Sequence, residues 1–265
     1  MKVVRLWVPV LGLVAWASPV SADLLLQFTS DWAPAFQINE VGAGTGRAAF
    51  GNSATMDGER KDLGANPGIA KAQSQAASIP NMNSRGQADV VFQRTFKLPG
   101  DTDWSVTLAG LLIGNLSATS PGNGLTAQAA VQGEGLIQDS MGRGQADIGG
   151  ANSVWFANLE PMQGTETLSI LEALQTTVIL HSGDYALSGT LETVARTDKA
   201  PVTAGQAKAD FFHSLSIGVS ATPIPGPASV VLILVGLSAG FFMLILRRRN
   251  EGQPQPTDAR LTRVP

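Results

Sequence analysis

The stretch that decides the fold is Val90-Val91-Phe92-Gln93-Arg94-Thr95-Phe96-Lys97-Leu98. Its even positions carry Val, Phe, Arg, Phe and Leu, whereas the odd positions after Val91 carry Gln, Thr and Lys. Successive side chains of a β-strand point to opposite faces of the sheet. The alternation therefore predicts a half-buried strand whose even positions point inward.

A second run with the same alternation follows after a short polar turn. The turn is Pro99-Gly100-Asp101-Thr102-Asp103, whose residue types favour tight turns. From Trp104 to Leu112, apolar residues and one glycine then alternate with Ser, Thr and Ala. Two alternating runs joined by a turn predict a β-hairpin over residues 90–112, in which the second run is the returning strand.

Further short runs on both sides of this hairpin indicate more strands. They are residues 24–28, 32–41, 125–137 (as one or two strands), 154–157, 185–192 and 211–219. Pro34 cannot donate a backbone hydrogen bond, so it limits 32–41 to a sheet edge. Because no long helices alternate with these runs, the sequence predicts a mainly β protein, an antiparallel β-sandwich or jelly-roll-like domain.

Other segments carry a weaker signal. Residues 42–87 sustain neither the helical nor the strand period, so we expect a long irregular excursion with one or two helical turns at 71–77. Residues 142–152 are expected to form a glycine-rich loop. Residues 167–180 fit either a helical turn or a strand.

One hexapeptide occurs twice. Arg85-Gly86-Gln87-Ala88-Asp89-Val90 recurs as Arg143-Gly144-Gln145-Ala146-Asp147-Ile148, and residues 205–210 echo it weakly. Each copy lies where a Gly-containing loop leads into an expected strand, so a shared way of starting a strand is one interpretation. Coincidence in a chain rich in Gly, Gln and Ala is the other, since the spacing is too irregular for a solenoid.

The charge distribution excludes one class of function. Residues 23–222 contain 11 Lys and Arg against 19 Asp and Glu, so this part of the chain is acidic. Binding to nucleic acid requires a positive face that displaces phosphate counterions. We therefore expect no nucleic-acid partner. The chain also has no cysteine, which excludes disulfides, thiol catalysis and thiolate metal sites.

The N-terminal residues have the three parts of a secretory signal. Lys2 and Arg5 supply positive charge, and Leu6 to Trp16 form a short apolar run. Val20-Ser21-Ala22 places small residues at the positions that signal peptidase requires. The sequence predicts a signal peptide over residues 1–22, with cleavage after Ala22 and an exported domain over residues 23–222.

The C-terminal region has three segments of different chemistry. Pro223-Ile224-Pro225-Gly226-Pro227 interrupts any preceding strand, and residues 228–246 then carry no charge. That span is long enough to cross a bilayer as a helix. Arg247, Arg248 and Arg249 favour the cytoplasmic side. We predict a transmembrane helix at 228–246 and a cytoplasmic tail at 250–265.

These three segments resemble, in order and spacing, the PEP-CTERM sorting signal that exosortases of Gram-negative bacteria recognise. The sorting motif would be Pro225, Gly226 and Pro227, and residues 223–249 would form the whole signal. Residues 209–215, Ala-Asp-Phe-Phe-His-Ser-Leu, are similar to a segment common near the end of such exported domains. The resemblance implies that an exosortase cleaves near the motif and transfers or releases the domain. It also implies association with exopolysaccharide or biofilm matrix.

The residues that could carry chemistry do not form a recognisable catalytic or metal-binding motif. His213 falls on the apolar phase of its expected strand, and His181 lies in a turn beside Asp184, with no second histidine or carboxylate cluster expected near it. Asp101 with Asp103, and residues 57–59, could lend oxygens to Ca²⁺, but solvated turn carboxylates are the favoured interpretation. We expect no metal, no cofactor and no catalytic residue.

A platform for stacking a sugar could be formed by three tryptophans, Trp32, Trp104 and Trp155, if their rings are exposed. Trp104 and Trp155 lie in apolar runs and are expected in the core, which leaves Trp32. The sequence thus predicts a non-enzymatic protein, exported through the inner membrane to the cell surface or extracellular matrix. The alternatives are a secreted polysaccharide hydrolase or a carbohydrate-binding adhesin, held by a permanent type I membrane anchor.

Overall fold

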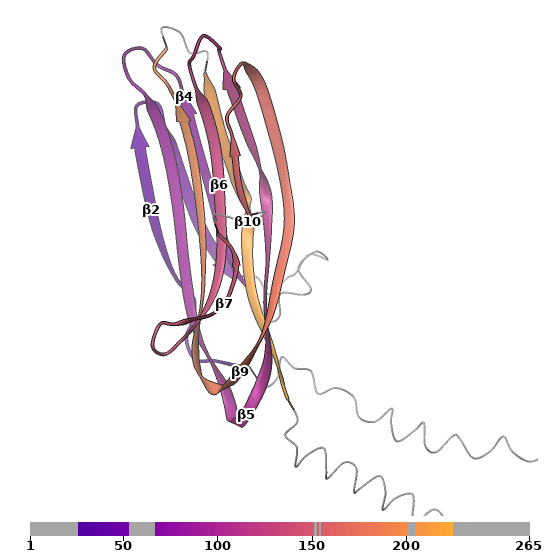
Figure 1. Ribbon diagram of the computed structural model, residues 1–265. Coiled ribbons are helices and arrows are strands. Elements are labelled where there is room, and N and C mark those ends of the chain that lie inside the picture. The colour runs from indigo at the N-terminus through magenta and orange to yellow at the C-terminus, as the bar shows by residue number, and fades with distance from the viewer. Residues whose placement is uncertain (1–25, 53–66, 151–152, 154, 201–204, 225–265) are drawn as a thin grey trace, which may run out of the picture. The chain divides into compact units, whose positions relative to one another are not determined.

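The computed structural model of the chain describes residues 26–52, 67–150, 153, 155–200 and 205–224. These residues form ten β-strands, all paired antiparallel (Figure 1). The strands are β1 (Gln27–Phe28), β2 (Ala33–Val41), β3 (Thr45–Asn52), β4 (Gly68–Ala77), β5 (Ser84–Ser120), β6 (Ala127–Asp139), β7 (Gly144–Gly149), β8 (Phe156–Leu159), β9 (Gly164–Thr197) and β10 (Gln206–Pro223). The mainly β, antiparallel fold class expected from the sequence is confirmed.

Two very long strands, β5 and β9, organise the fold. They contain 37 and 34 residues and pair with each other from Ser84↔Thr197 to Ser120↔Gly164. The pairing register shifts between Leu98 and Asp103, where both strands bend. Figure 1 shows this bend at the end of the domain where β5 and β9 are labelled.

The bend divides the strands between two layers. Sheet I contains β2, the first half of β5 (84–98), the second half of β9 (183–197) and β6, with β7 and β8 on the far side of β6. Sheet II contains the first half of β9 (164–181), the second half of β5 (103–120), β10, β4 and β3. β1 pairs with the end of the sheet I half of β5.

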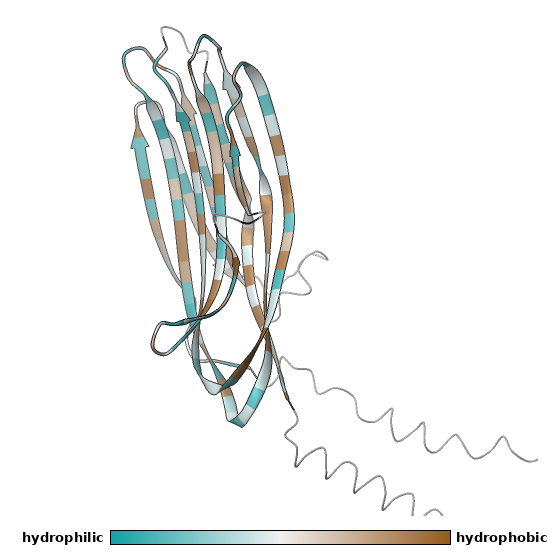
Figure 2. Ribbon diagram, viewed as in Figure 1, coloured by the Kyte–Doolittle hydropathy of each residue, from teal (hydrophilic) through white to brown (hydrophobic). Residues whose placement is uncertain are grey.

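Close contacts show that the inner faces of the two sheets pack on each other. A Cβ atom on Gly68 of sheet II would come within 2.7 Å of the Phe92 ring in sheet I. A Cβ on Gly135 of sheet I would come within 2.8 Å of Ile217 in sheet II. The domain is therefore a β-sandwich, and the alternation of hydrophobic and hydrophilic residues along its strands is visible in Figure 2.

The inner face of β5 confirms the alternation read from the sequence. The even positions Val90, Phe92, Arg94, Phe96 and Leu98 are all buried. Phe92 packs against the rings of Trp32 and Phe50, at centroid distances of 5.3 and 5.1 Å.

Arg94 is the one charged residue in that row. Its guanidinium carbon lies 3.3 Å from the centroid of the Phe28 ring and 5.0 Å from that of Trp32. Burial lowers the pKa of Arg94 to about 10, against the opposing effect of Asp31, so the side chain stays charged at neutral pH. The aromatic faces stabilise this charge by cation–π attraction.

The predicted hairpin over residues 90–112 is wrong. Its two runs are halves of the single strand β5, and they pair with opposite halves of β9 rather than with each other. The turn residues Pro99–Asp103 bend the strand from one sheet into the other. Alternation fixes which face of a strand is buried, but it does not identify the strand's partner.

The structure also corrects two weaker expectations and decides one that was left open between a helical turn and a strand. Residues 42–87 contain the strands β3 and β4, and residues 71–77 belong to β4 rather than to a helix. The expected loop at 142–152 contains β7. Residues 167–180 are strand. Apart from Ile69, the buried positions of β4 hold Ala, Ser and Gly, whose small side chains give little hydrophobic contrast along the sequence.

The edge position predicted for residues 32–41 agrees with the structure, since β2 pairs only with β5 within the described part of the chain. No helix among the described residues is long and apolar enough to cross a membrane. The predicted transmembrane helix at 228–246 and signal peptide at 1–22 lie outside those residues.

Candidate functional site

A groove of about 230 Å³ with a mixed polar and apolar lining, which includes Ala130, Val131 and Val194, lies on the outer face of sheet I. Strands β6, β8 and β9 supply its hydrogen-bonding and aromatic side chains: Gln128, Gln132, Phe156, Asn158, Glu192 and Arg196. We call this the sheet I groove.

Strand register explains why these side chains gather there. Gln132 of β6 lies opposite Glu192 of β9 on one side and Phe156 of β8 on the other. Two periods of the alternation away, beyond the pair of Ala130 and Val194, Gln128 lies opposite Arg196. Directly opposed residues share a face and have Cβ atoms about 4.5–5.5 Å apart, so these rows form a continuous surface across the strands.

A hydrogen-bond network holds Glu192 from the β5 side. The Gln87 side-chain amide donates to Glu192 Oε1 at 3.2 Å and to Asp89 Oδ2 at 2.9 Å, and the Arg85 guanidinium donates to Gln87 Oε1. Asp89 lies directly opposite Glu192 in the register. Burial raises the pKa of the Asp89 carboxyl above its ordinary value, the negative Glu192 raises it further, and Gln87 and Arg85 oppose both effects.

Only one carboxylate of this pair faces the groove. Asp89 Oδ1 is buried, and its Oδ2 accepts from Gln87, whereas Glu192 lines the groove itself. Glycoside hydrolysis uses two carboxyl groups placed on either side of the scissile bond. The groove therefore offers Glu192 as a hydrogen-bond acceptor, with Gln and Asn amides beside it, rather than an acid–base pair.

The shape and chemistry of the groove suit a sugar-sized group. Its volume is below the roughly 300–1,000 Å³ of sites that enclose a small molecule. Phe156 is 44% exposed, so part of this aromatic residue is accessible to a ligand. Amides and a carboxylate around an exposed ring can bind the hydroxyl groups and the apolar face of one sugar unit in a longer chain.

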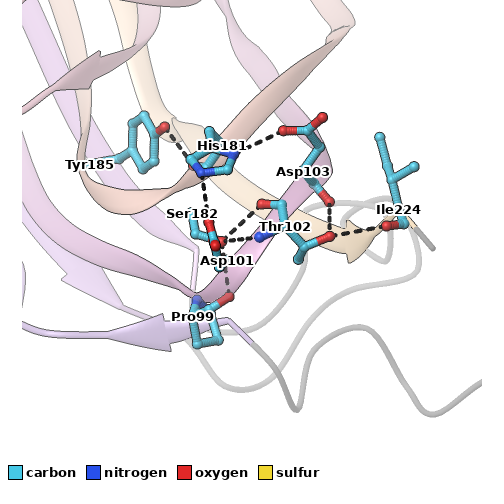
Figure 3. A network of polar contacts seen from close by, with 8 residues as sticks. All are labelled: Pro99, Asp101, Thr102, Asp103, His181, Ser182, Tyr185 and Ile224. Carbon is cyan, nitrogen blue, oxygen red and sulfur yellow. Dashed lines mark hydrogen bonds and ion pairs between the residues drawn. The ribbon is translucent and has the colours of Figure 1, made fainter. Parts of the chain in front are cut away.

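A second polar network occupies the bend of β5 and β9 (Figure 3). His181 lies between two carboxylates: its Nδ1 is 3.0 Å from Asp103 Oδ1, and its Nε2 is 3.2 Å from Asp101 Oδ1. The Tyr185 hydroxyl donates to the His181 carbonyl at 2.7 Å. The expectation that no carboxylate cluster accompanies His181 was wrong, because β5 brings both aspartates from 78 and 80 positions away in the sequence.

The same bend holds the end of β10. The Ile224 amide donates to the Asp103 carbonyl at 2.8 Å, and the Thr102 hydroxyl donates to the Ile224 carbonyl at 3.1 Å. The Thr102 amide donates to the Ser182 hydroxyl at 3.0 Å. These bonds connect the bends of both long strands to the residue just before Pro225, and they give this network a structural role.

We predict a pH-dependent stability from His181. The hydrogen bond to Asp103 raises the pKa of the His181 imidazole above its ordinary value, and Asp101 adds to this, although partial desolvation opposes it. A raised pKa in the folded state stabilises the fold below about pH 6.5, and this contribution is lost as the pH rises through the folded-state pKa.

Thermal melts of the wild type and of His181→Asn between about pH 5.5 and pH 8 measure this contribution. The wild type should be the more stable protein at the acid end, and the difference should shrink toward the alkaline end. A difference that is constant across this range would contradict the assignment.

The structure agrees with some of the predictions made for individual residues and differs from others. Trp104 and Trp155 are buried, as predicted, with 2% and 0% of their surface exposed. Trp32 is half-buried among Phe50, Phe92 and Arg94, so it is not an open stacking platform. Among the described residues, no group of three or more His, Asp or Glu side chains is arranged so that it could hold a metal ion.

The remaining sites of the sequence analysis lie outside the described residues. They are Ala22, residues 57–59, Pro225, Gly226 and Pro227, and Arg247, Arg248 and Arg249. His213 lies within β10, where the register with β4 and β5 shifts, and the structure does not describe its side chain.

The residues that line the sheet I groove were not predicted from the sequence as a binding site. One signal was present: in the first copy of the repeated hexapeptide, Arg85, Gln87 and Asp89 occupy alternate positions and so share the outer face of β5. All three hexapeptide-like segments lie at the start of a strand, β5, β7 or β10, as the first interpretation of the repeat expected. The Gln132, Phe156 and Glu192 positions carry no such motif, because they meet only through pairing of distant strands.

Comparison with family models finds no match, and comparison with curated proteins finds none either. Among solved structures, the enzymatically active domain of bacteriophage CBA120 tailspike protein 4 is similar at 12% identity and a TM-score of 0.22, over 74% of this chain and 20% of that chain. This chain therefore spans about a fifth of the tailspike chain.

Two carbohydrate-binding modules are similar at the same distant level. TmCBM61, solved with β-1,4-galactotriose, matches at 8% identity and a TM-score of 0.22, over 71% of this chain and 88% of that chain. The CBM22-1 xylan-binding domain of Paenibacillus barcinonensis Xyn10C matches at 11% identity and a TM-score of 0.19, over 74% and 94%. These likenesses are too distant to assign this chain to a family, and its function is inferred from its own residues.

Proposed function

We propose that this protein is an exported, non-enzymatic polysaccharide-binding protein of the cell surface or extracellular matrix. The observation that carries the proposal is the sheet I groove, in which Glu192, Gln132 and Phe156 lie side by side. A carboxylate and an amide bind vicinal hydroxyl groups, and an exposed ring covers an apolar sugar face. The ligand class is a neutral, hydroxyl-rich polysaccharide such as an exopolysaccharide of the biofilm matrix.

The charge of the groove supports a neutral ligand. Arg196 and Glu192 both line it, so it has no excess of either sign. Asp89 lies directly opposite Glu192 on the neighbouring strand and adds a second carboxylate beside that end. A polyanion would meet repulsion at this end, whereas sugar hydroxyl groups can donate to Glu192.

Export and sorting are the second part of the proposal. The signal sequence ending at Ala22, the motif Pro225-Gly226-Pro227 and the cluster Arg247–Arg249 support transfer through the inner membrane by a secretory route. The partner is an exosortase-type enzyme that cleaves near the motif and delivers the domain to the cell surface or matrix.

Mass spectrometry of the mature termini tests this part. In a host that contains an exosortase, we expect a mature N-terminus at Asp23 and a C-terminus near Pro227. In a matched host that lacks the enzyme, the C-terminal residues should remain attached. Identical full-length C-termini in both hosts would reject sorting and favour a permanent type I anchor.

Binding itself is tested with the purified full-length protein on immobilised galactan, xylan and dextran, with alginate as an anionic comparison. We expect retention on at least one neutral polysaccharide and weaker retention on alginate. The absence of retention on every neutral polysaccharide would overturn the binding proposal.

A secreted hydrolase is the alternative that must be tested, because Asp89 lies directly opposite Glu192, although only Glu192 lines the groove. A reducing-end assay on the same polysaccharides separates the two. Binding without release of new reducing ends favours the non-enzymatic proposal. Release that Glu192→Gln abolishes would favour the hydrolase.

A further inference from the structure

A second polar groove, of about 300 Å³, lies on the outer face of sheet II. We call it the sheet II groove. Its polar side chains come from β3, β4, β5 and β10: Thr45, Gln75, Ser117, Thr119, Gln206 and Lys208. None of these residues belongs to the sheet I groove.

The strand register again explains this groove, because it places one row of opposed side chains across four strands. Gln75 of β4 lies opposite Thr45 on one side and Lys208 on the other, and Lys208 lies opposite Ser117. The residues between them, such as Ala76 and Ala207, are buried between the sheets. The groove side chains consequently point away from the core.

The two grooves face in opposite directions. The inner faces of the sheets pack on each other, as Phe92 against Gly68 shows, so an outer face of sheet I and an outer face of sheet II lie on opposite sides of the sandwich. One ligand chain therefore cannot fill both grooves along a single face.

The chemistry of the sheet II groove matches that of a hydroxyl-rich ligand. Its lining offers hydroxyl groups and two amides, and its one cation is already neutralised, since Lys208 Nζ lies 2.6 Å from Asp210 Oδ2. Gln73 donates to the same Asp210 oxygen at 3.1 Å and fixes the pair. With no excess positive charge, the groove suits a neutral polysaccharide better than a polyanion.

We propose that the sheet II groove is a second polysaccharide site, so that one copy of the protein cross-links two polysaccharide chains. The inference rests on the proposed function of the sheet I groove and adds bivalency to it. Two sites on opposite faces join separate chains without any oligomer and without a covalent step.

A bridging assay tests this inference with the full-length protein. Galactan-coated beads are incubated with the protein and then with soluble fluorescent galactan, and the assay is repeated with xylan and dextran. Three variants are compared with the wild type: Gln75→Ala/Gln206→Ala in the sheet II groove, Glu192→Ala/Gln132→Ala in the sheet I groove, and Glu172→Ala/Gln175→Ala as a control. The control removes the same side-chain types from exposed positions of β9 outside both grooves.

We expect the wild type and the control to capture soluble polysaccharide on the beads. Each groove variant should lower this capture by about tenfold or more, because bridging needs both sites at once. The Gln75→Ala/Gln206→Ala variant should still be retained by the beads through the sheet I groove. Sedimentation velocity at the assay concentration should show a monomer.

Each other outcome has a distinct meaning. Two results would overturn bivalency and leave the proposed function standing. In the first, the beads retain the wild type but capture no soluble polysaccharide. In the second, the Gln75→Ala/Gln206→Ala variant captures as much soluble polysaccharide as the wild type does. Bridging only at concentrations where the protein is a dimer also overturns bivalency. If the beads do not retain the wild type at all, the proposed function fails and this inference fails with it.

Discussion

Replacement of Trp155 by alanine is expected to lower the free energy of unfolding by about 3–5 kcal/mol. Trp155 is fully buried and lies at the junction of the two sheets. A Cβ atom on Gly110 of sheet II would come within 2.2 Å of its ring, and one on Gly149 of sheet I within 2.7 Å. The ring occupies the space that these glycines leave open, so its removal creates a cavity that neither backbone can fill.

Polar bonds add to this cost. The Trp155 indole N–H donates to the Glu172 carbonyl of β9 at 3.0 Å, and the Gly133 amide of β6 donates to the Trp155 carbonyl at 3.0 Å. The first bond is lost in the alanine variant, which leaves a part-buried carbonyl without its donor.

Urea denaturation monitored by circular dichroism measures the effect. The matched control is Met162→Ala, since Met162 is 93% exposed and its loss should change the free energy of unfolding by less than about 0.5 kcal/mol. A Trp155→Ala variant within about 1 kcal/mol of the wild type would contradict the described packing.

The fold class could be predicted from the sequence because the pattern of buried and exposed residues can be recognised within a single strand. In β5 the large residues Phe92, Phe96 and Leu98 alternate with polar ones, and that contrast fixes the inner face. The same locality explains the failure of the predicted hairpin. Ser84 pairs with Thr197 and Ser120 with Gly164, and no local pattern specifies partners so distant in the chain.

Strand β4 was not predicted for another reason, which is that most of its residues are small. Ala70, Ala72 and Ala76 of β4 are buried and belong to the same hydrophobic core as the large side chains of the other strands. Such positions have no bulk of their own, so the sequence of β4 is equally compatible with a loop or a helical turn.

The candidate site was even less predictable. Gln132, Glu192 and Phe156 are ordinary residues at outward positions of three strands, and they become a groove only when β6 pairs with both β9 and β8. His181 gained its two aspartates in the same way, through the register of β5 and β9. The resemblance of residues 223–249 to a sorting signal, by contrast, could be read from the sequence because its three segments are contiguous, and it stays a prediction.

The second large effect is expected in the sheet I groove. The double variant Glu192→Ala/Gln132→Ala removes one charged and one neutral hydrogen-bonding group, worth together about 2–4 kcal/mol of binding free energy. The affinity for a neutral polysaccharide should fall by about 30-fold or more. The fold should tolerate the change, because removing Glu192 also removes its repulsion of Asp89, and Gln87 keeps its bond to Asp89.

Titration calorimetry tests the central claim most directly. The wild type, this double variant and the Glu172→Ala/Gln175→Ala control are each titrated with the neutral polysaccharide that retains the wild type most strongly. The claim predicts that the Kd of the double variant rises by about 30-fold or more, while the control keeps the wild-type value and all three proteins have similar melting temperatures. Equal Kd values for the wild type and the double variant would contradict the claim that the sheet I groove binds polysaccharide.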